Sequence, residues 1–207
     1  MGESRYQYVS LRLSLSFFLM KKNIKADQES HLVELLKRND SGAMRRVYDR
    51  YVEYLSAVCA RYIVGEADRK DVLQDTFIKI FTTINRFEYR GEGSLKAWMK
   101  KITVNEALRF LQKNVAANRV EYEPQLHDCA DEPEIDGLPD EVINDMILSL
   151  PTGYRMVFNL YVFEQKSHKE IGQLLGIAAD SSASQFSRAK SLLAKKVEEY
   201  KLTHQIR

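Results

Sequence analysis

Apolar residues recur at helical spacing through two long stretches of the chain, about residues 28–115 and about 140–202. This spacing predicts helices with one buried face, and no alternating pattern long enough for a strand is present. The stretch between them is acidic and holds three of the four prolines. The pattern predicts an all-α protein with two small helical domains joined by a linker. The expected divisions are an N-terminal extension at 1–27, a first domain at 28–117, an acidic linker at 118–139 and a second domain at 140–207.

The most regular apolar stripe lies in residues 68–87, and it consists of Leu73, Phe77, Ile80, Phe81 and Ile84. The opposite side, near the start of the same predicted helix, carries the polar residues Asp68, Asp71, Gln74 and Asp75. Acidic side chains at a helix start are favoured by the helix dipole, which alone could explain them. They could equally form a negative patch for a basic partner, and the pattern leaves both interpretations open.

A loop with two glycines, residues 88–94, follows this helix, and Ser94 is predicted to cap the next one. That next helix, residues 95–113, is expected to bury Leu95, Met99 and Ile102. Its outer face carries Lys96, Lys100, Lys101, Asn105 and Arg109. Cations beside Tyr89 and Trp98 suit single-stranded DNA, because phosphates need positive charge while bases pack against rings. The alternative for Trp98 is a core residue.

The C-terminal stretch has the pattern of a helix-turn-helix. Ser167 and Glu170 form an S-x-x-E capping box, and Gly176 supplies the left-handed residue that ends a short helix. The predicted buried stripe of that helix is Ile171, Leu174 and Leu175. A second helix follows with Phe186, Ala189, Leu193 and Val197 inside, and with Ser181, Ser184, Gln185, Arg188 and Lys195 outside. In such a motif the second helix enters the major groove of DNA, and a plain helical hairpin is the alternative.

Charge is distributed unevenly, although the net charge of the whole chain is only +2. Residues 86–119 carry eight Arg or Lys and three Glu, and residues 165–196 carry six Arg or Lys and two acids. Residues 120–145 carry ten Asp or Glu and no Arg or Lys. Two basic segments therefore flank one acidic segment, which favours contact with nucleic acid at two places.

Cysteine and histidine content argues against disulfide, metal and zinc-enzyme chemistry. Cys59 and Cys129 lie far apart and outside any C-x-x-C pair, so the reducing cytoplasm is the expected compartment. His127 lies close to Cys129, but in an acidic loop that makes a poor metal site. The H-x-E sequence that begins at His168 lacks the downstream P-C-x-x-C of a zinc deaminase. We expect no catalytic set, no metal and no cofactor.

The apolar run at residues 9–20 is too short to span a membrane and lacks the cleavage site of a signal peptide. No membrane insertion is therefore expected. We expect residues 1–19 to be either an over-extended start before Met20 or a disordered lead.

Four motifs in a fixed order carry a more specific signal. They are D-V-L-Q-D-T-F-I-K-I-F, then G-S-L-K-A-W-M-K-K-I-T-V-N-E-A-L-R, then L-P-x-x-x-R-x-V-F after the acidic linker, and finally E-I-G-x-L-L-G with a closing S-R-A-K. In this order the motifs resemble the extracytoplasmic-function (ECF) sigma factors of bacterial RNA polymerase. The resemblance covers roughly residues 28–200.

The resemblance implies a cytoplasmic factor that directs promoter-specific transcription initiation and performs no catalysis itself. Its implied partners are the largest subunits of core RNA polymerase, promoter DNA in duplex and melted form, and an anti-sigma factor. The acidic linker would extend toward the catalytic cleft of the polymerase.

The resemblance also assigns roles to individual residues. Polymerase would bind Asp68, Asp71, Gln74 and Asp75. The melted −10 element would be held by Tyr89, Arg90, Lys96, Trp98, Lys100, Lys101, Asn105 and Arg109. The duplex −35 element would be read by Lys169, Ser181, Ser182, Ser184, Gln185, Arg188 and Lys190.

Two positions depart from the family pattern. Ala178 stands where these sequences often have a capping serine or threonine, so Asp180 or Ser181 is expected to cap the reading helix a turn later. Ala183 stands where a basic residue is frequent, which predicts weak −35 binding by the isolated protein.

Two other classes of protein remain as alternatives. A stand-alone helix-turn-helix regulator would explain residues 151–200 but not the acidic helix face or the basic helix. An anti-sigma or other interaction protein would not need the basic helix at 95–113.

Overall fold

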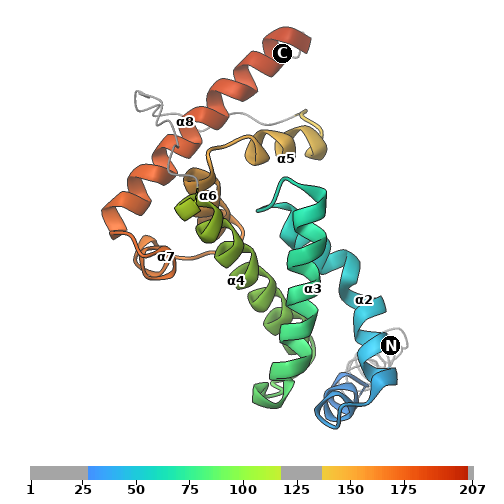
Figure 1. Ribbon diagram of the computed structural model, residues 1–207. Coiled ribbons are helices and arrows are strands. Elements are labelled where there is room, and N and C mark those ends of the chain that lie inside the picture. The colour runs from blue at the N-terminus through green and yellow to red at the C-terminus, as the bar shows by residue number, and fades with distance from the viewer. Residues whose placement is uncertain (1–27, 118–136, 205–207) are drawn as a thin grey trace, which may run out of the picture. The chain divides into compact units, whose positions relative to one another are not determined.

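The computed structural model describes residues 28–117 and 137–204, and every regular element in these ranges is a helix (Figure 1). The predicted all-α class is therefore confirmed. The predicted extension and most of the linker, including His127 and Cys129, lie outside the described residues.

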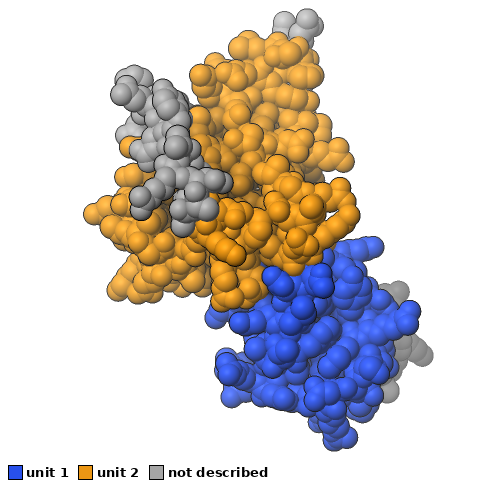
Figure 2. Space-filling view, in the orientation of Figure 1, with its two compact units in different colours: residues 1–55, 73–103 blue, residues 56–72, 104–207 orange. Residues whose placement is uncertain are grey.

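The first described helix covers residues 28–37. The elements that follow are α2 (Ser41–Ala60), α3 (Glu66–Thr83), the 3-10 turn η1 (Ile84–Arg86), α4 (Ser94–Ala117), α5 (Asp140–Leu148), α6 (Thr152–Val162), α7 (His168–Leu175) and α8 (Ala179–His204). They form two compact units, shown in Figure 2: unit 1 comprises residues 1–55 and 73–103, and unit 2 comprises residues 56–72 and 104–207. Helices α2, α3 and α4 each contribute to both units. The units do not coincide with the expected divisions at residues 117 and 140, which stay a prediction.

Unit 1 is built around the apolar stripes predicted from the sequence. Phe77, Ile80 and Ile84 are buried along α3 and η1, and Leu95 and Met99 are fully buried on α4. The first helix and α2 complete this core with Leu32, Val33, Leu36, Val47 and Leu55. Burial of each such side chain is worth about 1.5–3 kcal/mol, so the first helix is an integral part of the unit.

In unit 2, helix α8 packs against α6 and α7. Ala189, Leu193 and Val197 are buried on its inner face, as predicted. Phe186 is half-buried and packs against two rings of α6, with centroids 4.3 Å from Tyr161 and 6.0 Å from Phe158.

Two buried polar residues of α6 join the segments of unit 2. Arg155 donates hydrogen bonds to the carbonyl oxygens of Tyr62 (3.0 Å), Leu148 (2.6 Å) and Leu150 (3.0 Å). Asn159, which has no exposed surface, donates to the Arg61 carbonyl at 2.7 Å. These carbonyls lie at or just after the last turns of α2 and α5, where helix geometry leaves acceptors unpaired. The side chains thus supply donors that the helix ends lack.

Candidate polymerase and promoter interfaces

The polar face of α3 is exposed as a continuous patch. The side chains of Asp68, Asp71, Gln74 and Asp75 all lie at the surface. The nearby Lys70 forms its ion pair with Glu66, since its Nζ lies 2.7 Å from Glu66 Oε1. Within the described ranges no hydrogen bond or ion pair engages the side chains of Asp71, Gln74 or Asp75. The patch therefore keeps its negative charge available to a basic partner.

The loop between η1 and α4 is a closed turn. Gly91 and Gly93 have φ of 107° and 85°, a left-handed conformation that side-chain-bearing residues rarely adopt. The Ser94 hydroxyl accepts a hydrogen bond from Arg90 N (3.2 Å) and donates one to the Gly91 carbonyl (2.7 Å). The expectation that Ser94 caps α4 is therefore wrong: the helix already begins at Ser94, whose hydroxyl turns back to close the loop.

Glu29, from the first helix, takes the capping role at α4. Its Oε2 accepts a hydrogen bond from Gly93 N at 2.9 Å, and its Oε1 accepts one from Leu95 N at 3.0 Å. The side chain is only 7% exposed. The first amides of a helix have no partner within it, and a carboxylate there also suits the helix dipole. Sequence reasoning missed this residue, since Glu29 is more than sixty residues away along the chain.

Aromatic residues beside the loop belong to the core of unit 1. Phe87 is buried, and its ring centroid lies 5.1 Å from that of Trp98. Trp98 and Tyr89 are half-buried and pack against the same core cluster. Trp98 therefore packs against the core with part of its ring exposed, and DNA contact through the exposed part of Trp98 or Tyr89 stays a prediction.

Among the polar residues of α4 and of the loop, several already contact another side chain. Lys96 places its Nζ 4.0 Å from the ring centroid of Tyr54, and Arg109 lies 3.0 Å from Glu106. In the loop, Arg90 lies 3.2 Å from Glu88. Lys101 and Asn105 are exposed on the surface of α4, whereas Lys100 is half-buried.

The start of α7 forms as the sequence predicts. Glu170 N donates to the Ser167 hydroxyl (3.3 Å), and Ser167 N donates to Glu170 Oε2 (2.9 Å). The helix ends at Gly176, with a φ of 71°. The hydrogen bonds from Ser167, followed by the hydrogen bond and charge of Lys166, lower the pKa of Glu170 to about 2. The capping box and the glycine end are both confirmed.

The packing of α7 differs from the expectation at one position. Ile171 is fully buried, but Leu174 is 42% exposed, so its assignment to the buried stripe is wrong. The buried residue beside Ile171 is Gly172, which faces the turn after α7. A Cβ at this position would lie 2.6 Å from the Ile177 carbonyl oxygen. Glycine therefore allows α7 to sit directly against the turn that leads into α8.

The predicted reading residues of α8 fall into two groups. Ser181 and Ser184 are exposed, as is Lys169 of α7, while Gln185, Arg188 and Lys190 are half-buried. The Arg188 Nη1 lies 3.4 Å from the Tyr154 hydroxyl, and the Lys190 Nζ lies 5.5 Å from the Phe186 ring centroid.

Ser182 points away from this surface. Its side chain is fully buried, and its Oγ lies 3.0 Å from His168 Nδ1. His168, the first residue of α7, is half-buried, and its ring stacks on that of Tyr161 with the centroids 4.8 Å apart. Helix α8 begins at Ala179, so the expectation that Asp180 or Ser181 caps it is also wrong: Asp180 lies inside the first turn.

Comparison with known proteins agrees with this layout. The family model for sigma-70 region 2 matches residues 47–116, and that for sigma-70 region 4 matches residues 140–193. The ECF RNA polymerase sigma-E factor of Haemophilus influenzae is 27% identical over 180 residues, which cover 81% of this chain and 94% of that protein. The chain belongs to the ECF sigma factors.

Two further matches are similar in extent. The RNA polymerase sigma-H factor of Pseudomonas aeruginosa is 25% identical to this sigma factor over 182 residues, 82% of this chain and 93% of that protein. Among solved structures, the sigma factor RpoE of Bartonella quintana, determined with the anti-sigma factor NepR, has a TM-score of 0.47 and 21% identity. That match covers 74% of this chain and 96% of the other.

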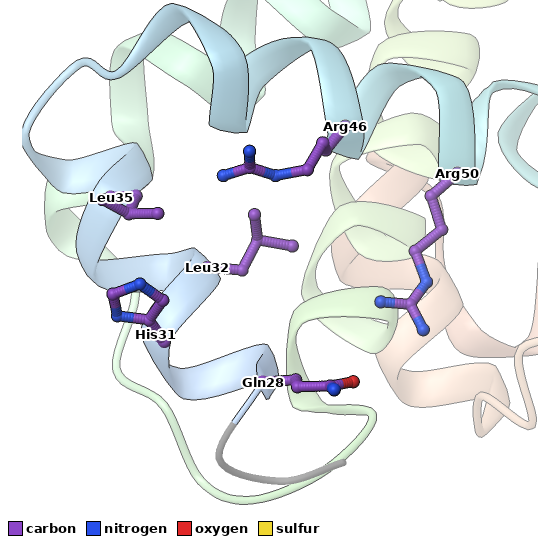
Figure 3. Close-up of a pocket in the computed structure, with 6 residues that line it drawn as sticks. All are labelled: Gln28, His31, Leu32, Leu35, Arg46 and Arg50. Carbon is purple, nitrogen blue, oxygen red and sulfur yellow. The ribbon is translucent and has the colours of Figure 1, made fainter. Parts of the chain in front are cut away.

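A basic pocket of about 640 Å³ lies in unit 1 between the first helix and α2 (Figure 3). Arg46 and Arg50 extend from α2 on one side, and Leu32 lies between the helices. Gln28, His31 and Leu35 complete the lining. Sequence reasoning did not single out this pocket, because its residues come from two helices that face each other only in the folded chain.

Hydropathy gives no sign of a transmembrane helix in the part of this sigma factor that the structure describes: none of its helices is long and apolar enough.

Proposed function

We propose that this sigma factor directs promoter-specific transcription initiation by joining core RNA polymerase to two promoter elements. The observation that carries the proposal is the presence of region 2 and region 4 in one chain and in that order. A stand-alone helix-turn-helix regulator would account for region 4 alone, so it is not favoured. In this proposal the protein supplies recognition and performs no chemical step, since the polymerase makes the RNA.

Core polymerase binds the exposed patch of α3 in this proposal. Asp71, Gln74 and Asp75 present two charges and one amide without partners among the described residues. Such a patch attracts a basic surface over distances of about a Debye length, roughly 8 Å at physiological ionic strength.

The 88–94 loop and the outer face of α4 would hold the melted −10 strand. Lys101 and Asn105 are exposed there, and Lys96 is exposed close to the Tyr54 ring. Extruding a base costs a few kcal/mol, which stacking and phosphate contacts must offset. A strong salt dependence of promoter opening is therefore expected.

Helices α7 and α8 would read the −35 duplex. The exposed hydroxyls of Ser181 and Ser184 and the half-buried Gln185 and Arg188 form the polar surface of α8. Ser182 is left out of this surface, since it is buried. With so few cations, this unit depends on the tether to polymerase for its occupancy of DNA.

The cytoplasm, where polymerase and chromosome meet, is the location we propose for the protein. We also propose an anti-sigma factor as its regulatory partner. Such a protein would compete for one of the surfaces above.

The first test measures binding to core polymerase. Asp75→Lys reverses one charge of the α3 patch, so affinity should fall at least about tenfold. The matched control is Glu198→Lys, an exposed glutamate late in α8, which should bind as the wild type does. A wild-type protein that does not bind core polymerase would refute the proposed function. Equal affinity of Asp75→Lys and wild type would instead move the interface away from α3.

The second test is transcription in vitro by core polymerase with this protein on a promoter library. Randomised −35 and −10 positions should each show selected bases. Selection at −35 alone would contradict the role of the loop and α4.

A further inference from the structure

We propose that Glu29 is a positioning residue for −10 recognition, which acts by fixing the place of the 88–94 loop. The inference rests on the proposed function of that loop. Region 2 is matched only from residue 47, so the first helix lies outside the family match and has no assigned role.

The geometry gives Glu29 two separate tasks. One carboxylate oxygen accepts from Gly93 N, in the loop directly before α4, and the other accepts from Leu95 N, in the first turn of α4. The two amides lie on either side of Ser94. A single carboxylate therefore orients both the end of the loop and the beginning of the helix.

Placement of the loop differs from its shape. Ser94 closes the loop through local hydrogen bonds to Arg90 and Gly91, which set its internal conformation. Those bonds do not connect the loop to the core of the unit. Besides the packing of Tyr89 against the core, Glu29 connects the loop to it by hydrogen bonds, because Leu32, Val33 and Leu36 bury its helix in the core with exposures of 8%, 3% and 0%. Rigid support of this kind is what a recognition loop needs in order to place its contacts accurately.

A carboxylate is the group that this site requires. Two N–H donors need two acceptors, and a glutamine amide offers only one acceptor oxygen beside an NH₂ group. Glu29→Gln therefore deprives one amide of its partner and removes the negative charge from the start of α4. The side chain keeps its size, so the change is confined to hydrogen bonding and charge.

The experiment compares Glu29→Gln with Glu34→Gln, an exposed glutamate on the same helix, in complex with core polymerase. Opening of a duplex promoter is followed by 2-aminopurine fluorescence at −10, on a preferred promoter and on one altered at a single −10 base. We expect Glu29→Gln to bind core polymerase as the wild type does. Its preference for the correct −10 base should fall about tenfold, the loss that one charged hydrogen bond can produce. Glu34→Gln should keep the wild-type preference.

The inference is overturned if folded Glu29→Gln keeps the wild-type −10 preference, because a cap that matters only for stability would do so. A second variant, Glu29→Asp, retains both acceptor oxygens on a shorter side chain and covers the case in which Glu29→Gln does not fold. We expect an intermediate loss of preference, and a wild-type preference in Glu29→Asp overturns the inference in that case.

Failure of the proposed function looks different. In that case the wild type and Glu34→Gln also open no promoter with core polymerase, and the inference falls with it.

Discussion

At the starts of α4 and α7, side chains accept hydrogen bonds from backbone amides that the helix itself leaves unpaired. The two helices differ in how far away along the chain these side chains lie. At α7 the partners are Ser167 and Glu170, three residues apart and exposed. At α4 the partner is Glu29, more than sixty residues away and buried. The first arrangement forms with one turn of helix, whereas the second exists only when the first helix has joined the core. The start of α7 in the proposed −35 reader is thus organised locally, whereas the loop of the proposed −10 reader depends on the tertiary structure.

The largest predicted effect comes from removing the carboxylate of Glu29, which caps α4 from a distant part of the chain. Glu29→Ala leaves the Leu95 amide without an acceptor in a buried setting and the Gly93 amide without one in a partly buried setting. Each such group costs about 1–3 kcal/mol, so the free energy of unfolding of unit 1 should fall by roughly 2–4 kcal/mol. Urea unfolding followed by fluorescence of Trp98, the single tryptophan, measures this directly.

Ser167→Ala is the comparison for that experiment. The variant frees the Glu170 amide, which lies at the surface and can bind water, so the loss should be about 1 kcal/mol, seen in amide exchange of α7. Equal costs for the two variants would contradict the contrast between a distant and a local cap.

The next effect concerns the packing that holds α7 against α8. Gly172→Ala places a methyl group 2.6 Å from the Ile177 carbonyl oxygen, so the turn must shift. Overpacking of this kind costs about 1–3 kcal/mol. We expect a lower free energy of unfolding for unit 2 and poorer −35 discrimination, with core polymerase binding retained.

Gln173→Ala is the control for that change, because Gln173 is the exposed neighbour on the same helix. Unit 2 should keep its wild-type stability in this variant. If Gly172→Ala were as stable as Gln173→Ala, the close approach of α7 to the turn would have no energetic importance.

The same contrast explains which features could be predicted from the sequence. The capping box at Ser167 and the glycine end at Gly176 depend on neighbours within one or two turns, and both were predictable. Apolar stripes at helical spacing also located the cores of both units. The burial of Ser182 and the capping by Glu29 depend on segments brought together by folding, and no local pattern encodes them. Leu174 shows the limit of periodicity, because apolar spacing places a residue on a face but does not say where that face ends.

The smallest effect tests the electrostatic part of the local cap. Hydrogen bonds from Ser167 and the nearby Lys166 lower the pKa of Glu170 from 4.5 to about 2. A carboxyl group whose pKa is lower in the folded state adds stability above its unfolded pKa, and that stability is lost as the pH falls through the folded value. Glu170→Gln should therefore destabilise α7 slightly near pH 7. The difference from wild type should shrink between about pH 4.5 and 2 and vanish below that range.

Amide exchange of α7 across this pH range measures the difference, with Glu198→Gln, an exposed glutamate of α8, as the matched control. The contribution is small because the group is exposed and solvent screens it. Glutamine can still occupy the third position of a capping box, so the hydrogen-bonded part of the cap survives and only the charge is removed. A difference that persisted well below pH 2 would show that Glu170 acts through its shape and hydrogen bonds. In that case the start of α7 would owe its stability to acceptor geometry more than to charge.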